Sequence, residues 1–149
     1  MKSCKIGLIA CGGRGVNAWR AHQPENGTVI VAGADTDSQA LRTFKEHFRH
    51  AELFSDYREL LSIREIDAVM ISAPLPFHGQ MALDALNAGK SVFLEKPMAA
   101  TLEECDKLIR LARKNDLKIF VGHNLRKFSF VSTMKELIES GAIGEVKTI

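Results

Sequence analysis

The sequence predicts an α/β protein built on a doubly wound parallel sheet. Short apolar runs alternate with helical patterns from one end of the 149 residues to the other. Most of the apolar runs are continuous rather than alternating, which is typical of strands buried on both faces of a parallel sheet. A glycine-rich turn follows the first run. Strands that alternate with helices form a parallel sheet, and the helical connections between parallel strands are right-handed. These two rules favour the doubly wound sheet over other topologies.

Six strands are expected, one from each apolar run. The run at 52–54 is shorter and weaker than the other five. The segment 144–149, GEVKTI, is typical of a further strand, and because the chain stops inside it we expect the polypeptide to be part of something longer. The expected strands of the sheet lie at residues 5–10, 28–34, 52–54, 68–72, 91–94 and 118–122.

Helical patterns fill the intervals between the strands. Several of them carry recognisable ends: Thr101 and Glu104 have the spacing of a capping box, and Gly89 and Gly141 are natural C-terminal stops. These local signals agree with the periodicity of the apolar residues. The expected helices lie at residues 13–22, 38–48, 56–62, 79–88, 102–115 and 129–140.

The amino-acid composition argues against some classes of partner. Hydrophobic residues make up 46% of the chain and charged residues 26%, which is ordinary for a globular protein. The net charge of +2 is small and the basic residues are scattered, so we expect neither a nucleic-acid nor a membrane partner. No apolar stretch approaches the roughly 18 residues of a membrane span.

The three cysteines suggest a reducing, cytoplasmic environment. Cys4, Cys11 and Cys105 are an odd number without a close pair, so they form neither a disulfide framework nor a metal-binding spacing. We therefore expect no metal site. Cys11 lies inside the glycine turn and is open to two interpretations, a small buried residue or a redox-sensitive thiol beside a ligand, of which the first is favoured.

The turn after the first strand has the pattern of a dinucleotide-binding fingerprint. The three fingerprint positions are Ala10, Gly12 and Gly15. Gly12 lets a pyrophosphate approach the backbone, Gly15 lets the helix pack closely on the strand, and Ala10 replaces the first glycine. Alanine is tolerated there if its φ stays negative. The turn expected to hold the pyrophosphate consists of Ala10, Cys11, Gly12, Gly13, Arg14 and Gly15.

The second strand ends in an acidic residue that suits an adenine ribose. Asp35 follows Gly15 by twenty residues, and a carboxylate at that place can accept both ribose hydroxyls. Asp37 is the better candidate for a cap of the next helix. An ionised Asp35 would repel a 2′-phosphate, which favours NAD over NADP, although Arg14 or Arg42 could compensate.

Two further stretches, 71–81 and 88–101, lie at predicted strand C-termini, where open α/β sheets bind ligands. Lys96 directly follows a buried strand and can reach into the crevice to hold a substrate hydroxyl. The alternative is that Lys96 is a solvent-exposed lysine on a loop.

Six stretches of the sequence carry a family resemblance. In chain order they are IACGGRG, AGAD, SAPLPFH, ALNAGKSVFLEKPMAAT, VGHNLRKFSF and LIESGAIGEV.

With these stretches the chain resembles, along essentially its whole length, the N-terminal domain of the Gfo/Idh/MocA oxidoreductases, and Glu95-Lys96-Pro97 matches the hallmark tripeptide of that family. The resemblance implies that Lys96 is the active-site lysine, which contacts substrate and nicotinamide ribose, and that Glu95 lies near the nicotinamide. It also implies that Pro97 shapes this loop through a cis peptide bond.

The same resemblance adds cofactor contacts elsewhere. The family's Pro–Asn–x–x–His-like segment matches Pro74 and His78, with Leu75 in place of the asparagine. His78 is either close to the cofactor or bonded to backbone at a helix start. Arg126 matches an arginine that closes the nicotinamide end. The remaining cofactor-binding residues that the resemblance implies are Ser72 and Ala73.

The resemblance also implies a domain plan and an activity. Residues 1–124 would form the Rossmann NAD(P)-binding domain, and 125–149 a connecting helix and the first strand of a C-terminal α/β domain absent from this chain. The whole enzyme would transfer hydride between a nicotinamide and a sugar, cyclitol or related polyol as a homo-oligomer, with its general base in the missing domain. Two alternatives stay open: an NAD-binding module without catalysis of its own, and an NAD-using non-redox enzyme that cleaves glycosides.

Overall fold

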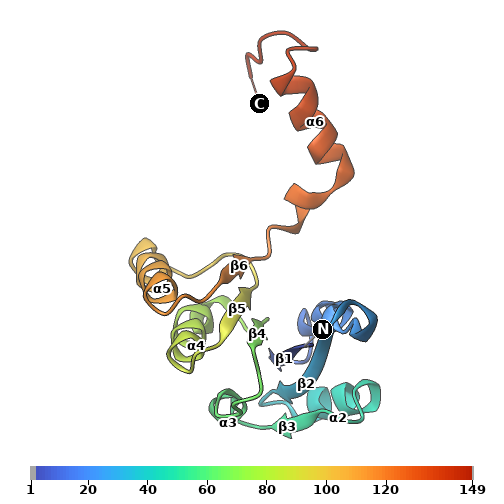
Figure 1. The fold of residues 1–149 in the computed structure, drawn as a ribbon, viewed down its shortest axis with the longest axis vertical. Coiled ribbons are helices and arrows are strands. Elements are labelled where there is room, and N and C mark those ends of the chain that lie inside the picture. Colours follow the sequence, from blue (N-terminus) through green and yellow to red (C-terminus); the bar gives the residue numbers. More distant parts are fainter. Residues whose placement is uncertain (1–2, 149) are drawn as a thin grey trace.

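The computed structural model describes residues 3–148 and contains one six-stranded sheet in which all strand pairs are parallel. The strand order is β3-β2-β1-β4-β5-β6, which is a doubly wound arrangement with its crossover between β1 and β4 (Figure 1). All six expected strands are confirmed; three have the expected bounds, and the ends of the other three differ by at most one residue. The strands are β1 (Cys4–Ile9), β2 (Thr28–Ala34), β3 (Glu52–Phe54), β4 (Ala68–Ile71), β5 (Ser91–Leu94) and β6 (Ile119–Val121).

Helices connect the strands as expected, with two differences: one helix is shorter than expected, and another starts earlier. The helical turn after β1 is short and tightens into a 3₁₀ turn, Trp19–Ala21. The helix after β4 starts at Leu75, four residues earlier than the pattern predicts, because Pro76 occupies its first turn, where a missing N–H is harmless. The helices are α1 (Gly15–Ala18), α2 (Ser38–His47), α3 (Tyr57–Leu61), α4 (Leu75–Asn87), α5 (Leu102–Lys114) and α6 (Ser129–Glu139), with further 3₁₀ turns at Pro24–Asn26 and Asn124–Lys127.

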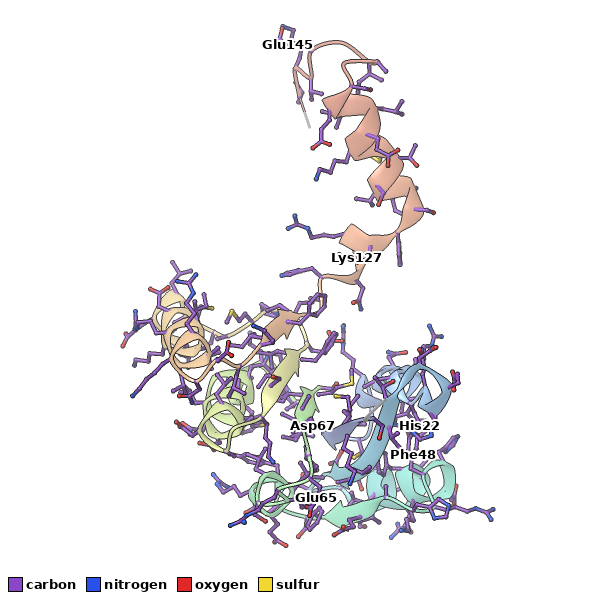
Figure 2. All side chains as sticks on the ribbon, in the orientation of Figure 1. His22, Phe48, Glu65, Asp67, Lys127 and Glu145 are labelled. Atoms are coloured by element: carbon purple, nitrogen blue, oxygen red, sulfur yellow. The ribbon has the colours of Figure 1, made fainter. Side chains whose placement is uncertain are left out.

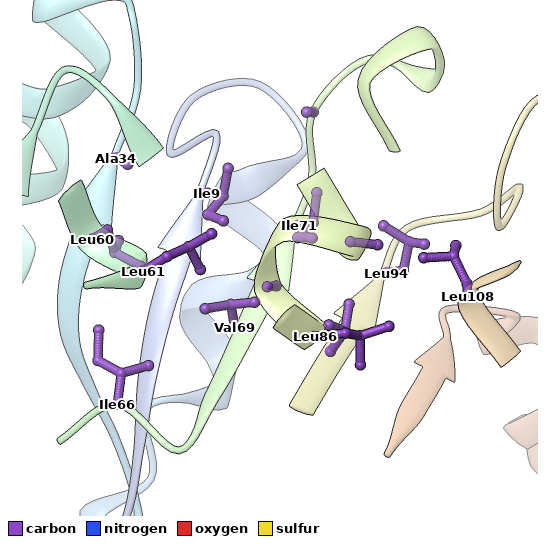
Figure 3. Packing of buried hydrophobic residues seen from close by; sticks show 14 of the residues in the cluster. Ile9, Ala34, Leu60, Leu61, Ile66, Val69, Ile71, Leu86, Leu94 and Leu108 are labelled. Atoms are coloured by element: carbon purple, nitrogen blue, oxygen red, sulfur yellow. The ribbon is translucent and has the colours of Figure 1, made fainter. Parts of the chain in front are cut away.

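The helices bury the sheet from both sides. On one face, α3, α4 and α5 pack on the strands through residues such as Leu60, Leu86 and Leu108, all fully buried (Figure 3). On the other face, α1 and α2 cover β1 and β2 through Ala18 and Phe44. Burial of large apolar side chains contributes roughly 1.5–3 kcal/mol each, so these two clusters carry the stability of the domain. The loops at the carboxyl ends of the strands remain accessible.

One buried charge supports the fold away from those loops. Lys90 is only 5% exposed, and its Nζ donates to the carbonyl oxygens of Ile63, Arg64 and Ile66 at 2.6, 3.3 and 2.8 Å. Burial lowers the pKa of Lys90, because desolvation disfavours the charged form. The three carbonyl oxygens offset that desolvation. Lys90 thus ties the start of β5 to the segment between α3 and β4.

The C-terminal segment stands apart from the sheet. Helix α6 extends away from it, and the labelled Lys127 and Glu145 mark a segment that projects from the domain (Figures 1 and 2). None of the residues of α6 is buried. The strand expected at 144–149 is not formed at 145–148, and residue 149 lies outside the described residues. A strand is held by hydrogen bonds to a neighbouring strand, and residues 3–148 offer none there.

None of the helices within residues 3–148 is long and apolar enough to cross a membrane. The described residues also hold no group of three or more His, Cys, Asp or Glu side chains that could bind a metal ion.

Candidate functional site

Two adjoining cavities lie at the carboxyl edge of the sheet, where loops from five strands meet. The first, here called the turn cavity, has a volume of about 620 Å³ and runs along the glycine turn. Its lining residues are Ala10, Gly12, Gly13, Arg14, Asp35, Thr36, Asp37, Ala40, Ser72, Ala73, Pro74, Leu75, His78, Glu95 and Lys96. Eleven of the fourteen residues expected to bind cofactor are therefore brought together in one groove.

The second, here called the outer cavity, has a volume of about 630 Å³ and continues past the loop after β5. It shares Arg14, Glu95 and Lys96 with the turn cavity. Its full lining is Arg14, Asn17, Arg20, Glu95, Lys96, Gly122, His123, Asn124, Leu125, Arg126 and Phe128. Arg126 thus lines the outer cavity only. Of the expected cofactor residues, just Cys11 and Gly15 line neither cavity, because both are buried beneath the turn.

Sequence reasoning missed several lining residues of the outer cavity. Asn17 and Arg20 follow Arg14 at intervals of three, which places all three on one side of a helical turn, so that spacing could have revealed them. His123, which follows β6, also lines this cavity. Phe128 belongs to a loop whose course no local pattern predicts.

The backbone of the glycine turn differs from the expectation at Ala10. Its φ is +67°, in the left-handed region, so the expected negative φ is wrong. The turn needs that conformation because Ala10 N donates to Ala34 O at 2.8 Å while the chain reverses into α1. A left-handed φ at alanine costs roughly 1–2 kcal/mol, which explains why fingerprints usually carry glycine there.

Ala10→Gly is therefore expected to stabilise the domain. Relief of the left-handed strain outweighs the larger chain entropy of unfolded glycine by about 0.5–1 kcal/mol. For a chain of this size that corresponds to a rise in melting temperature of about 1–4 °C. Thermal denaturation followed by circular dichroism measures it. An unchanged or lower melting temperature would show that Ala10 is not strained.

The remaining glycines of the turn have distinct tasks. A Cβ on Gly15 would lie 1.9 Å from Ala10 O, so only glycine fits where α1 begins against the turn. A Cβ on Gly12 would come within 3.1 Å of Ala40 Cβ. The N–H groups of Gly13 and Arg14 have no acceptor among residues 3–148, and both residues line the turn cavity. Unpaired N–H groups at such a turn favour an anionic ligand.

Asp35, which follows the end of β2, holds the glycine turn in place through hydrogen bonds. Its Oδ2 accepts hydrogen bonds from Cys11 N at 2.8 Å and Gly12 N at 3.1 Å, and its Oδ1 accepts one from Asp37 N at 2.9 Å. A carboxylate offers about four acceptor positions, two on each oxygen, so one position remains for a ligand hydroxyl, on Oδ1. Asp37 caps α2 by accepting from Gln39 N at 2.8 Å, which confirms the expected cap.

Cys11 is a structural residue of this turn. Its side chain is fully buried, and its thiol makes long contacts to the carbonyl oxygens of Leu8 and Ala34, at 3.7 and 3.6 Å. Burial, together with the charge of Asp35, raises the pKa of Cys11 to about 12. The thiolate, which is the reactive form, is therefore suppressed at neutral pH. Of the two interpretations, the structure favours the small buried residue.

A thiol reagent should distinguish Cys11 from the other cysteines. In the native protein at about pH 8, we expect iodoacetamide to modify the half-buried Cys105 far faster than Cys11, because Cys11 has neither access nor thiolate. Peptide mass spectrometry measures the rate at each site. Denatured protein, in which all three cysteines should react alike, is the control. Equal native rates at Cys11 and Cys105 would contradict a buried, protonated thiol.

His78 joins the two loops of the groove. It is 2% exposed; its Nε2 lies 2.7 Å from Ala73 O, and its Nδ1 lies 2.8 Å from Pro97 O. Carbonyl oxygens only accept hydrogen bonds, so both bonds exist together when both ring nitrogens carry hydrogen. His78 is therefore bonded to backbone, as one of its two interpretations expected, and it also lines the turn cavity. The peptide bond between Lys96 and Pro97 is cis, as expected.

The loop after β5 presents Lys96 to both cavities. Glu95 N donates to Ile71 O at 3.0 Å, which anchors the start of the loop to β4. The Lys96 side chain is exposed and forms no salt bridge with any carboxylate in the described part of the chain. Its ammonium group is therefore available for a ligand that enters where the two cavities meet.

A third, smaller cavity of about 260 Å³ adjoins Asp35 on the side away from Lys96. Its lining is mostly apolar and includes Tyr57, Phe77 and Met81. The Tyr57 hydroxyl donates to Asp84 Oδ2 at 2.7 Å, which holds the ring in place. An apolar slot next to a ribose-binding carboxylate suits a flat aromatic base. No local pattern in the sequence predicts this cavity, because its walls come from four separate segments.

Strand order, the glycine turn at the first strand–helix junction and the acidic end of β2 define this chain as a dinucleotide-binding domain of the Rossmann class. A family model described as "Oxidoreductase family, NAD-binding Rossmann fold" matches residues 4–123. The chain belongs to this family, the Gfo/Idh/MocA oxidoreductases, as its sequence motifs indicated.

Individual relatives agree with this membership. The chain is 41% identical over 120 residues to the 1-carboxy-3-chloro-3,4-dihydroxycyclo hexa-1,5-diene dehydrogenase of Comamonas testosteroni, covering 80% of this chain and 30% of the relative. It is 31% identical to an inositol 2-dehydrogenase of Burkholderia multivorans, covering 94% and 42%. The scyllo-inositol dehydrogenase of Lactobacillus casei, solved with NAD(H) and scyllo-inositol, superposes with a TM-score of 0.88 at 29% identity, covering 97% and 43%. The chain thus spans less than half the length of these relatives.

Proposed function

We propose that this chain is the nucleotide-binding domain of an NAD-dependent dehydrogenase that oxidises a CH–OH group of a sugar, cyclitol or related polyol. The observation that carries the proposal is the continuous groove from Asp35, past the free N–H groups of Gly13 and Arg14, to Lys96. The relatives support the reaction class, since they are named as dehydrogenases of inositols and of a dihydroxylated ring.

The residues present fit a dinucleotide at every part of that groove. The apolar slot at Phe77 and Met81 would take the adenine, and Oδ1 of Asp35 would accept one hydroxyl of its ribose. The unpaired N–H groups of Gly13 and Arg14 would hold the pyrophosphate. Those cofactor contacts that the sequence motifs imply, at Ser72, Ala73, Pro74, His78, Glu95, Lys96 and Arg126, lie farther along the groove or in the adjoining outer cavity.

Lys96 is the residue proposed to act in the reaction. When bound, the nicotinamide ring supplies the acceptor for the hydride that leaves the substrate carbon. The Lys96 ammonium, placed where the two cavities meet, would hold the reacting hydroxyl oxygen and stabilise negative charge that develops there. The proton of that hydroxyl would go to a base in the part of the enzyme beyond this chain, so the isolated domain is proposed to bind but not to turn over.

NAD is proposed in preference to NADP. The Asp35 carboxylate would repel a 2′-phosphate, and Arg42, which could have compensated, is bonded along its own helix to Gln39 Oε1 at 2.7 Å and Ser38 Oγ at 3.4 Å. A homo-oligomeric whole enzyme, a cytoplasmic location and the domain boundary after residue 124 stay predictions of the sequence. A cofactor that co-purifies and does not exchange would favour the non-redox alternative.

Titration with NADH and NADPH tests the proposal. Trp19 is the single tryptophan and adjoins α1, so energy transfer from Trp19 to bound reduced nicotinamide gives a direct signal. We expect saturable NADH binding that is weakened at least about tenfold by Asp35→Ala and lost in Gly12→Val, because each change removes a ligand contact or fills the groove.

Asp56→Ala is the matched control. Asp56 caps α3 as Asp37 caps α2, but it lies outside the groove, so its loss should lower stability by about 1 kcal/mol and leave NADH affinity unchanged. Absence of saturable NADH binding, or equal binding by the Gly12→Val variant, would refute the proposed site.

A further inference from the structure

The charges along the site are divided between its two ends. Arg14, Glu95 and Lys96 line both cavities. Apart from these three, the charged residues of the turn cavity are both acidic, Asp35 and Asp37. Those of the outer cavity are both basic, Arg20 and Arg126, and His123 also lines it. The end that would receive the adenosine is therefore negative, and the end beyond the nicotinamide is positive.

The positive charge of the outer cavity is local and does not reflect a high net charge of the whole chain. The chain has 20 basic and 18 acidic residues, so its net charge is only +2. Within the described part of the chain, neither Arg20 nor Arg126 forms a salt bridge, and Glu95 is the single carboxylate that lines the outer cavity. Like charges gathered in one concave surface repel each other and favour an anionic ligand there.

The phosphates of the cofactor do not account for both arginines. Under the proposed function the pyrophosphate lies at the N–H groups of Gly13 and Arg14. Arg20 follows Arg14 by six residues along a continuous helical turn, which corresponds to about 9 Å of axial rise. Arg126 comes from the loop after β6, on the side of the cavity formed by Asn124–Lys127. Both therefore line the space that a substrate would occupy.

We propose that the substrate is an acidic polyol, whose anionic group, a carboxylate or a phosphate, is bound by Arg20 and Arg126 while its reacting hydroxyl faces Lys96. Guanidinium groups match the planar, paired oxygens of such anions. Lys96 lies at the junction with the turn cavity, so one ring can span from the arginines to the nicotinamide end. This assignment rests on the proposed function and goes one step further, because it states that the polyol substrate is negatively charged.

The test compares ring polyols that differ in charge. Quinate, inositol 1-phosphate and myo-inositol are titrated into the 149-residue chain by isothermal calorimetry, with and without saturating NADH. We expect quinate, inositol 1-phosphate or both to bind at least about tenfold more tightly than myo-inositol at low salt, and the preference to shrink as salt is added. Quinate and inositol 1-phosphate distinguish the carboxylate from the phosphate.

Arg20→Gln is expected to remove most of this preference, because it deletes the charge and keeps a hydrogen-bonding side chain. The control is Arg113→Gln, an exposed arginine near the end of α5, which should leave the preference intact. Equal affinity for all three polyols, or an anion preference that survives Arg20→Gln and Arg126→Gln, would overturn the assignment.

The NADH affinity of the same variants separates this inference from the proposed function. Weaker NADH binding in Arg20→Gln without any anion preference would show that the arginine serves the cofactor, which overturns the inference and leaves the dehydrogenase proposal standing. Failure of the wild-type chain to bind NADH counts against the proposed function alone, since the titrations without NADH still decide whether the outer cavity selects anions.

Discussion

Gly15→Ala is expected to destroy the glycine turn and abolish NADH binding. The new Cβ would lie 1.9 Å from the carbonyl oxygen and 3.0 Å from the carbonyl carbon of Ala10, and backbone atoms cannot rotate away as a flexible side chain can. Forced overpacking of this kind costs about 3 kcal/mol or more. Denaturant unfolding measures the loss of stability, and the Trp19 energy-transfer titration measures NADH affinity.

Gly13→Ala is the matched control in the same turn. Gly13 has a φ of +50°, but a Cβ there would meet no atom within 4 Å. Only the left-handed conformation is then penalised, at roughly 1–2 kcal/mol. A Gly15→Ala protein as stable as the Gly13→Ala protein would show that the approach of α1 to the turn is looser than the structure indicates.

His78→Leu is expected to lower stability by about 3 kcal/mol and to weaken NADH binding. The substitution removes the imidazole nitrogens that face the carbonyl oxygens of Ala73 and Pro97 in a buried place. Each lost partner of a buried polar group costs roughly 1–3 kcal/mol. The loop that carries Lys96 also loses its tie to the turn after β4, so NADH should bind less tightly as well.

Two variants make the His78 prediction specific. His78→Gln retains one N–H donor group and should fall between the wild type and His78→Leu. His50→Leu changes an exposed histidine outside the site and should shift stability by no more than about 0.5 kcal/mol. Wild-type stability and NADH affinity in His78→Leu would mean that the two carbonyl contacts do not hold the loops together.

One face of the sheet is only partly covered by helices. Leu8, Met70, Phe93 and Phe120 are paired across β1, β4, β5 and β6, so their side chains form one row on the face that α1 and α2 cover. The cluster under those helices extends as far as Met70 of β4, whereas Phe120, on the edge strand, is 48% exposed. The β6 end of this face therefore presents apolar surface to solvent.

The sequence by itself determined the strands, most helix ends and the family. Strands buried on both faces need continuous apolar runs, and a helix cap needs a short side chain next to its own backbone, as at Asp37 and Thr101. Such requirements are local, so a reader of the sequence can find them. The same holds for Gly12 and Gly15, whose spacing follows from the shape of a phosphate-binding turn.

Only the tertiary structure decided how the site is held and how its charge is distributed. The bonds from Asp35 to Cys11 and Gly12 span more than twenty residues, and His78 reaches Pro97 from the neighbouring strand–helix unit. The left-handed φ of Ala10 follows from its hydrogen bond to β2. Arg20 and Arg126 line one cavity only because the sheet brings the segments after β1 and β6 to the same edge. These are contacts between segments distant in the chain, and the local periodicity that reveals strands and helices carries no information about them.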